Sequence, residues 1–169
     1  MKQFKTLLIA AALFIGASQT ISAQAKVAHI DVQELMTNMP EMKTAQAQIK
    51  KVGETYDKEY NTMVTEYQNK MKKYESEAAT AGEATNETRA KEMQDMGQRI
   101  QQYRETAQKE LQQKEMDLVK PIMDKAKAAI QKVAKAKGYQ YVLDSTTGSG
   151  VIVADGPNIL VDVKKELGF

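Results

Sequence analysis

An apolar side chain returns every eleven residues through the first half of this chain, and no other feature restricts the possible folds as much. Between residues 45 and 78, apolar or small side chains follow one another in steps of three and four positions. Ile49, Tyr60 and Met71 form one track of this repeat. Eleven residues in three helical turns correspond to 3.67 residues per turn, so the stripe follows one side of a nearly straight helix. The pattern therefore predicts one long helix with an apolar seam.

A second segment has the same period and is the predicted partner of this helix. Its main track is Ile100, Leu111, Ile122 and Val133. Between the two arms, Ala81-Gly82 suits the end of a helix, because glycine accepts backbone angles that other residues avoid. Thr85 is expected to cap the second helix through its hydroxyl group. We therefore predict an antiparallel coiled-coil hairpin, whose first arm of about 38 residues would extend roughly 57 Å.

The two ends of the chain change from helix to strand chemistry. Pro121 is expected to bend the second arm as it leaves the hairpin, and Gly138 is expected to end it. A short helix at 163–167, capped by Asp162, would close the chain. Strands are predicted at 27–32, 139–144, 151–154 and 159–161.

These elements predict an α+β fold, in which a helical hairpin at 41–120 projects from a small β body built from 26–40 and 121–169. A body of this size buries little apolar surface, and its short sheet would leave strand edges open. We therefore expect the body to self-associate through those edges, and we predict that six aliphatic residues form the contacts. They are Val27, Ile30, Val32, Val142, Val151 and Val153.

The first 25 residues have the pattern of a secretory signal peptide. Lys2 and Lys5 precede an apolar run at 6–17, and small residues follow at 23–25, where cleavage is expected. An uncleaved anchor is the alternative, but the run has about a dozen residues and a bilayer span needs roughly 20. The mature protein is therefore expected to be exported and soluble.

Composition argues against several functional classes. The chain has 24 basic and 22 acidic side chains. Because Lys2 and Lys5 belong to the predicted signal, the rest of the chain is formally neutral. A nucleic-acid-binding protein usually has a clear excess of basic side chains. It has no cysteine, which excludes disulfides, thiolate catalysis and thiolate metal ligands. His29 is the single histidine, too few for a typical zinc site, and we interpret it as a structural strand residue. Neither an enzyme nor a cofactor is expected.

Two segments near the ends of the chain resemble the Skp/OmpH family of periplasmic chaperones. The segment 26–36, Lys-Val-Ala-His-Ile-Asp-Val-Gln-Glu-Leu-Met, is similar to the family's opening strand, and Pro40 fills the position before its first helix. The second landmark is 130–144, where a helix rich in lysine and alanine leads through Gly138 into Tyr-Gln-Tyr-Val-Leu-Asp. The resemblance covers essentially the whole chain after residue 25.

The resemblance implies a jellyfish-like homotrimer in the periplasm, with three helical tentacles on a small β body enclosing a cavity. Such proteins hold unfolded outer-membrane β-barrel proteins without ATP and prevent their aggregation. A structural coiled-coil spacer or adaptor of the cell envelope is the alternative function. Tentacles of this family are often markedly basic, whereas residues 41–137 carry 19 basic and 16 acidic side chains. That balance argues against strong contact with a membrane surface or lipopolysaccharide.

Methionines and tyrosines of the hairpin are the candidate client-binding residues, because flexible and adaptable side chains suit promiscuous apolar recognition. They are Met63, Tyr67, Met71, Tyr74, Met93, Met96 and Tyr103. Several of them lie on the eleven-residue seam, so packing between the two arms is the alternative interpretation. Clients are expected to be held by many weak contacts rather than at one site.

Overall fold

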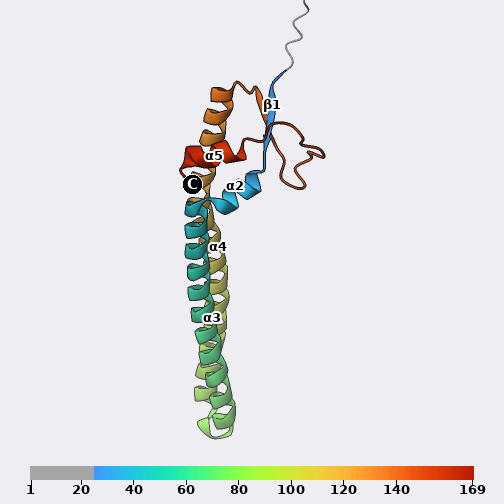
Figure 1. The fold of residues 1–169 in the computed structure, drawn as a ribbon. Helices are drawn as coiled ribbons and strands as arrows, with labels where there is room; N and C mark the ends of the chain where they lie inside the picture. The colour runs from blue at the N-terminus through green and yellow to red at the C-terminus, as the bar shows by residue number, and fades with distance from the viewer. Residues whose placement is uncertain (1–24) are drawn as a thin grey trace, which may run out of the picture.

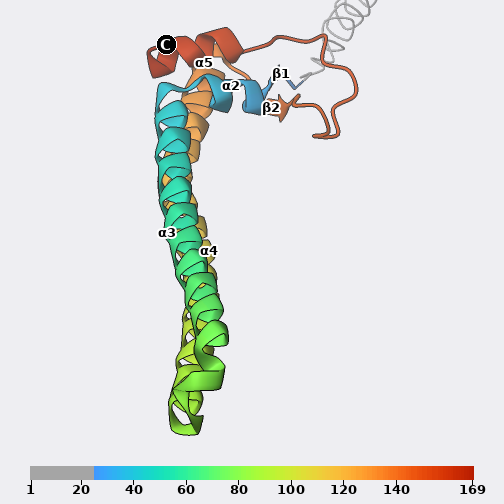
Figure 2. The same cartoon turned by 90° about the horizontal axis from the view of Figure 1, so that it is seen from below.

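The computed structural model describes residues 25–169, which form a long two-helix hairpin attached to a small body (Figure 1). The predicted signal peptide lies outside the described residues except for Ala25. In chain order the elements are β1 (Val27–Ile30), α2 (Val32–Asn38), α3 (Pro40–Ala81), α4 (Glu83–Lys137), β2 (Tyr141–Asp144) and α5 (Leu160–Leu167). Figure 2 shows α2 and α5 at the end of the hairpin, with β1 and β2 to one side. The predicted α+β class with a long antiparallel hairpin is confirmed.

A single residue turns the chain between the two arms of the hairpin. Gly82 has φ 79° and ψ 161°, a combination that is open essentially to glycine alone. The predicted cap at Thr85 was wrong, because α4 begins directly after Gly82 and Thr85 already lies inside the helix. Asn86 stabilises the turn instead, because its side-chain amide donates to the Ala78 carbonyl at 2.8 Å. One of the free carbonyls at the end of α3 is thereby satisfied.

The second arm is one unbroken helix from Glu83 to Lys137. Pro121 lies inside it, so the bend predicted there does not interrupt the helix, although proline removes one backbone donor. Gly138 ends it as predicted, in the left-handed conformation with φ 72° and ψ 25°. The Gly138 and Tyr139 N–H groups donate to the carbonyls of Lys135 and Ala134 at 3.1 and 2.9 Å, as in a Schellman motif.

Two short parallel strands replace the larger sheet that the sequence predicted. In the register, Val27 lies opposite Tyr141 and Ile30 lies opposite Asp144. The free side of β1 is bridged at His29 by Asn158, with the His29 N–H donating to the Pro157 carbonyl at 2.9 Å. β1 is therefore the middle of this small arrangement, and the outer edge of β2 has no strand beside it among the described residues.

All four strand predictions were wrong in whole or in part, although the second differs only in beginning at Tyr141 instead of residue 139. The first strand ends at Ile30, because the Asp31 carboxylate accepts from the Glu34 N–H at 2.7 Å and starts α2, which places Val32 in a helix. The segment 151–154 forms no strand in this chain, and 159–161 leads into α5 instead. Asp162 does not cap that helix; it lies in the first turn and pairs with Lys137 at 2.6 Å.

The hydrophobic core lies where the hairpin meets the body, and every element except β2 buries side chains in it. Ile30, Leu35, Met39, Ile159 and Val163 are the large side chains that are fully buried. Met42 and Ala45 of α3 and four residues of α4 pack around them: Ile122, Ala126, Ala129 and Val133. Each large aliphatic side chain buried in this way contributes about 1.5–3 kcal/mol. We call this region the junction.

Beyond the junction, the hairpin has almost no buried interior. We call residues 46–121 the shaft, and all of them are described by the structure. Met96 is the single residue of the shaft that is buried, with 8% of its surface exposed. The other seam positions, such as Ile49, Tyr60 and Leu111, are half-buried. Two helices alone can cover each other on one side only, so their seam stays in contact with water.

Candidate functional site

The predicted client-binding residues line the seam between α3 and α4. Met63, Tyr67, Tyr74, Met93 and Tyr103 are half-buried there, and Met96 is buried. Met71 differs, because 44% of its surface is exposed although it belongs to the eleven-residue track. The structure therefore brings these residues into one line along the hairpin. In the conformation observed, Met71 is the member of this set with the largest exposed fraction.

Tyrosines and glutamates join the two arms in the middle of the shaft. The Tyr56 hydroxyl of α3 donates to Glu110 of α4 at 2.6 Å, and the Tyr103 hydroxyl of α4 donates to Glu59 of α3 at 2.7 Å. The two rings meet edge to face, with centroids 6.3 Å apart and an angle of 74°. Desolvation and the neighbouring Glu59 carboxylate raise the pKa of Tyr103 to about 12. Both phenols therefore stay protonated donors at neutral pH.

A second polar group joins the arms nearer the tip. Glu92 accepts from the Tyr74 hydroxyl at 2.5 Å and pairs with Lys70, and these partners hold the pKa of the Glu92 carboxyl below its usual range. The Arg89 guanidinium lies 4.6 Å from the centre of the Tyr74 ring and pairs with Glu77 at 2.5 Å. Cation–π and charge-assisted contacts of this kind tolerate water around them. Polar contacts thus join the two arms in addition to the apolar contacts of the half-open seam.

Small residues leave a depression beside the tyrosine pair. Its volume is about 460 Å³, and its lining includes Gly53, Tyr56, Tyr60, Tyr103, Ala107 and Leu111. A Cβ placed on Gly53 would lie 3.9 Å from the nearest Leu111 methyl carbon, an ordinary contact distance. The depression is open to solvent and offers aromatic and aliphatic surface on the shaft.

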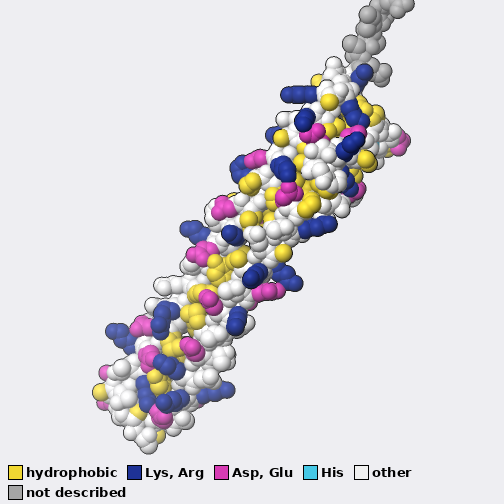
Figure 3. Space-filling model, turned by 60° about the vertical axis from the view of Figure 1, so that its left-hand side comes forward, with side chains coloured by type: hydrophobic (Ala, Val, Ile, Leu, Met, Phe, Trp, Pro, Cys, Tyr) yellow, Lys and Arg dark blue, Asp and Glu magenta, His cyan; other side chains and the backbone are white. Residues whose placement is uncertain are grey.

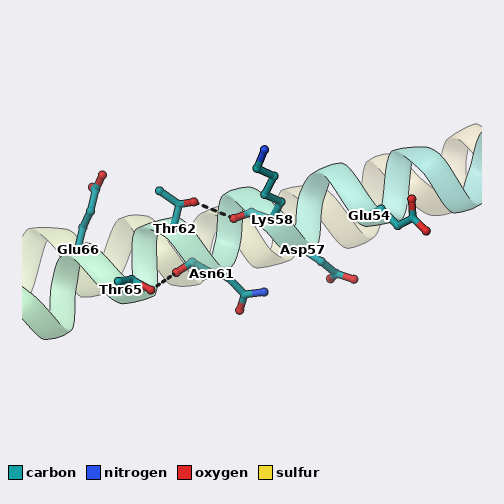
Figure 4. A pocket seen from close by; sticks show the side chains of 7 residues that line it. All are labelled: Glu54, Asp57, Lys58, Asn61, Thr62, Thr65 and Glu66. Carbon is teal, nitrogen blue, oxygen red and sulfur yellow. Dashed lines mark hydrogen bonds between the residues drawn. The ribbon is translucent and has the colours of Figure 1, made fainter.

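The outer side of α3 is polar by comparison (Figure 4). The surface there is lined by residues such as Glu54, Asp57 and Glu66. The Thr62 and Thr65 hydroxyls donate back to the carbonyls of Lys58 and Asn61 at 2.9 and 2.7 Å. These hydroxyls are occupied within their own helix, and such bonds tend to curve a helix slightly. This side of α3 offers charged and hydroxyl groups rather than apolar surface.

Two further methionines of α4 are exposed and were not among the predicted client-binding residues. The exposed fractions of Met116 and Met123 are 57% and 56%. Both lie off the tracks of the eleven-residue repeat, which run through Leu111, Leu118 and Ile122. Their positions outside an otherwise regular apolar repeat are the sequence signal from which they could have been predicted as exposed.

The body exposes a group of apolar side chains around its two strands. Val27, Tyr141 and Leu143 are 40%, 61% and 46% exposed, and the strand register together with side-chain alternation places them on one face of the sheet. In the loop that follows β2, Ile152 is 97% exposed and Val153 is 71% exposed. Such large exposed aliphatic side chains are unusual on a monomer surface when they gather in one region.

The six residues predicted for self-association divide into two groups. Ile30 is buried in the core of its own chain, and Val32 and Val142 pack against that core. Val151 is half-buried, whereas Val27 and Val153 point outward. Tyr141, Leu143 and Ile152 also belong to the outward group, and the sequence analysis did not name them.

His29 has a structural environment. Its Nδ1 lies 3.0 Å from the Ser145 hydroxyl and its Nε2 lies 3.1 Å from the Gly156 carbonyl oxygen, so the ring ties β1 to both ends of the loop after β2. Within residues 25–169, no group of three histidine, cysteine or acidic side chains is placed to hold a metal ion. None of the helices in that same range has the length and apolar character needed to cross a membrane.

Comparison with known proteins gives one consistent result. The family model of outer membrane protein (OmpH-like) matches residues 26–167. A chaperone protein Skp of Photorhabdus laumondii is 24% identical over 165 residues, covering 96% of this chain and 99% of that protein. A chaperone protein Skp of Pectobacterium atrosepticum is 21% identical over 155 residues, covering 92% and 93%. A crystal structure from Caulobacter crescentus, described as that of a putative OmpH-like outer membrane chaperone, has a TM-score of 0.75 at 19% identity. The structural match covers 85% of this chain and 83% of the Caulobacter chain.

Proposed function

Since this chain belongs to the OmpH-like outer membrane protein family, we propose that it is an ATP-independent periplasmic holdase for unfolded outer-membrane proteins. The observation that carries the proposal is the shaft itself, in which two long helices leave most of their seam only half-buried. A half-open seam keeps methionine and tyrosine side chains within reach of an unfolded chain. Many weak contacts of this kind can retain a client without a defined binding pocket.

Self-association of the body is part of this proposal, with three copies as in the jellyfish-like arrangement. The exposed side chains Val27, Tyr141, Leu143, Ile152 and Val153 support it, because association would remove them from water. The outer edge of β2 and the unpaired apolar segment 151–154 offer backbone groups that a neighbouring copy can pair with. The body would comprise 26–40 and 121–169, and the tentacle 41–120.

The proposed mechanism needs neither nucleotide nor catalysis. The sequence has no glycine-rich loop of the phosphate-binding type, so release of clients would follow from weak, reversible contacts. Because the charges on 41–137 nearly balance, attraction to clients is mainly apolar and changes little with salt. The same balance makes lipopolysaccharide a minor partner.

The test is the suppression of aggregation when an unfolded outer-membrane β-barrel is diluted out of urea. The deciding variant lacks residues 56–111 and joins the remaining ends by a short glycine–serine linker. Gly53 faces Leu111 across the hairpin, so these ends are neighbours and the junction core is left intact. We expect this variant to keep the oligomeric state of the full protein, measured by sedimentation, and to lose holding activity.

A spacer or adaptor of the cell envelope is the second candidate, and the cross-seam bonds of Tyr56 and Tyr103 favour it, since they stiffen the shaft. Such a protein needs length and does not need to bind unfolded chains. If the variant lacking 56–111 protects a β-barrel as well as the intact protein does, the holdase proposal is wrong and the spacer remains.

A further inference from the structure

A second apolar line runs along α4, away from the seam. Met116, Val119, Met123 and Ile130 follow one another in steps of three, four and seven residues, which places them on one face of the helix. Val119 and Ile130 are partly buried against the junction core, whereas Met116 and Met123 are 57% and 56% exposed. The line therefore leads from the end of the shaft onto the body. Figure 3 shows hydrophobic side chains gathering where the hairpin meets the body.

These two methionines contrast with most others of the protein. Nine methionines lie in the described residues, and Met39, Met42 and Met96 among them are 0%, 8% and 8% exposed. Met36 packs against the junction core, and Met63 and Met93 are half-buried in the seam. Met71 is the remaining exposed methionine, at 44%. Oxidants in water reach thioethers according to their exposure, so the molecule has a small and defined oxidisable set.

We propose that Met116 and Met123 form a modification site, at which peroxides oxidise the thioethers to sulfoxides and thereby weaken the hold on unfolded chains. The sulfur lone pair attacks one peroxide oxygen, the O–O bond breaks, an S–O bond forms, and hydrogen peroxide leaves as water. Sulfur loses two electrons and the peroxide gains them. A reductase that draws on a dithiol reverses the reaction, with the oxygen leaving again as water.

The consequence follows from where the two side chains lie. A sulfoxide is polar, so oxidation would interrupt the apolar line at its exposed end and remove surface that an apolar segment of a client contacts. Oxidation of these two residues is expected to leave the fold intact, because neither side chain belongs to the junction core. Oxidation of Met39 would instead place a polar group in that core and destabilise the protein. The effect on clients rests on the proposed holdase function, whereas the modification itself does not.

The first measurement is the order of oxidation in the intact oligomer. The protein is treated with hydrogen peroxide, and sulfoxide at each methionine is followed by peptide mass spectrometry. We expect Met116 and Met123 to react at least about tenfold faster than Met39 and Met96. Equal rates for the exposed and buried pairs would overturn the modification site.

The second measurement separates regulation from simple damage. Met116→Leu combined with Met123→Leu keeps the apolar line and removes the oxidisable sulfurs, and Met71→Leu is the matched control on the shaft. Circular dichroism confirms that each treated protein is folded. Because clients are held by many weak contacts, each sulfoxide removes only part of the holding surface. After peroxide, we expect the wild type and the Met71→Leu variant to lose a measurable part of their suppression of aggregation, and the double variant to lose clearly less.

Equal loss in the double variant and the wild type would show that Met116 and Met123 do not control holding. If the untreated wild type does not suppress aggregation at all, the holdase proposal fails. The oxidation order then still reports on the modification site, so the two failures are distinguishable.

Discussion

Near the body, α3 and α4 bury Met42, Ala45 and Ile122 against three other elements, whereas along the shaft the same two helices bury only Met96. The helices do not change in kind between the two regions, and their apolar period is continuous. The number of neighbours differs, because α2, β1 and α5 close the junction and nothing else in residues 25–169 closes the shaft. A dry core at one end and a wet seam at the other predict a rigid base with a compliant arm.

The electrostatic contacts differ in the same way. At the junction, ion pairs surround a core that is already complete, as in Lys132 with Glu166 at 2.5 Å and Lys164 with Glu34 at 3.1 Å. In the shaft, the bonds of Tyr56, Tyr74 and Tyr103 lie on the seam itself and replace apolar contacts there. Exposed pairs contribute little to stability, so the junction is expected to depend on its core and the shaft on the sum of weaker contacts.

Truncation of a leucine in each region gives the largest expected difference. Leu35 is fully buried at the junction, so Leu35→Ala is expected to lower the free energy of unfolding by about 2–5 kcal/mol. Leu111→Ala is the matched change on the half-buried seam and is expected to cost well under half as much. Urea unfolding at one fixed protein concentration measures both, since association contributes to stability. Equal losses would show that the shaft has a core comparable with the junction.

Amide hydrogen exchange tests the comparison without mutation. The amides of residues 60–105 are expected to exchange at least about tenfold faster than those of β1 and of residues 122–134, because local opening of the shaft exposes little new apolar surface. The segment 151–154 forms no backbone ladder with any of the residues that the structure describes, and its protection would therefore report on pairing with another copy. Uniform protection along 60–134 would contradict a compliant shaft.

High pH is expected to loosen the shaft more than the junction, because the buried residues of the junction core include no charged side chain. The pKa of Tyr103 is about 12 in the folded protein, against 10.0 for an ordinary tyrosine, because the phenol is desolvated and donates to the Glu59 carboxylate. The protonated phenol therefore contributes to the stability of the fold in full below pH 10. That contribution is lost as the pH rises from 10 towards 12, where the phenol gives up its proton. Absorbance of tyrosinate followed against pH measures the titration, and helix content measures the response.

Tyr103→Phe is the matched variant for the pH experiment, because it keeps the ring beside Tyr56 and removes only the hydroxyl. Its stability between pH 10 and 12 is expected to fall less steeply than that of the wild type. An identical slope in both proteins would show that Tyr103 does not govern the alkaline response.

The sequence predicted the hairpin well because helical side-chain contacts repeat locally. The eleven-residue period located both arms, and Gly82 and Gly138 marked their ends for reasons of backbone geometry. The period also placed the candidate residues in one line, and it could not tell how deeply two helices alone would bury them. Met116 and Met123 were missed as surface residues because the repeat draws attention to the seam.

The body was harder to predict because its pairing is not local. Val151, Ile152 and Val153 have strand propensity, yet a strand needs a partner, and none of the described residues of the chain provides one. Short apolar runs do not distinguish strand from buried helix, and the run beginning at Ile159 became the start of α5. Asp31 with Glu34 three residues later was a readable helix start that would have predicted α2.

The smallest expected effect concerns the two glycines inside the arms, Gly53 and Gly97. A Cβ added at Gly97 would meet no atom within 4 Å, and the residue lies in the interior of α4. Gly97→Ala is therefore expected to raise the free energy of unfolding by about 0.5–1 kcal/mol. Gly138→Ala is the control, since its φ of 72° is unfavourable for alanine and the same change should destabilise the protein.

The value of this small change is that stability and holding should move in opposite directions. If clients are retained by a shaft that opens and adapts, a stiffer α4 will exchange its amides more slowly and hold an unfolded β-barrel less well. If the hairpin acts as a spacer, the stiffer helix will perform at least as well in any assay of its length or reach. Gly97→Ala that gains stability and holds clients more tightly would show that compliance of the shaft is not what retains them.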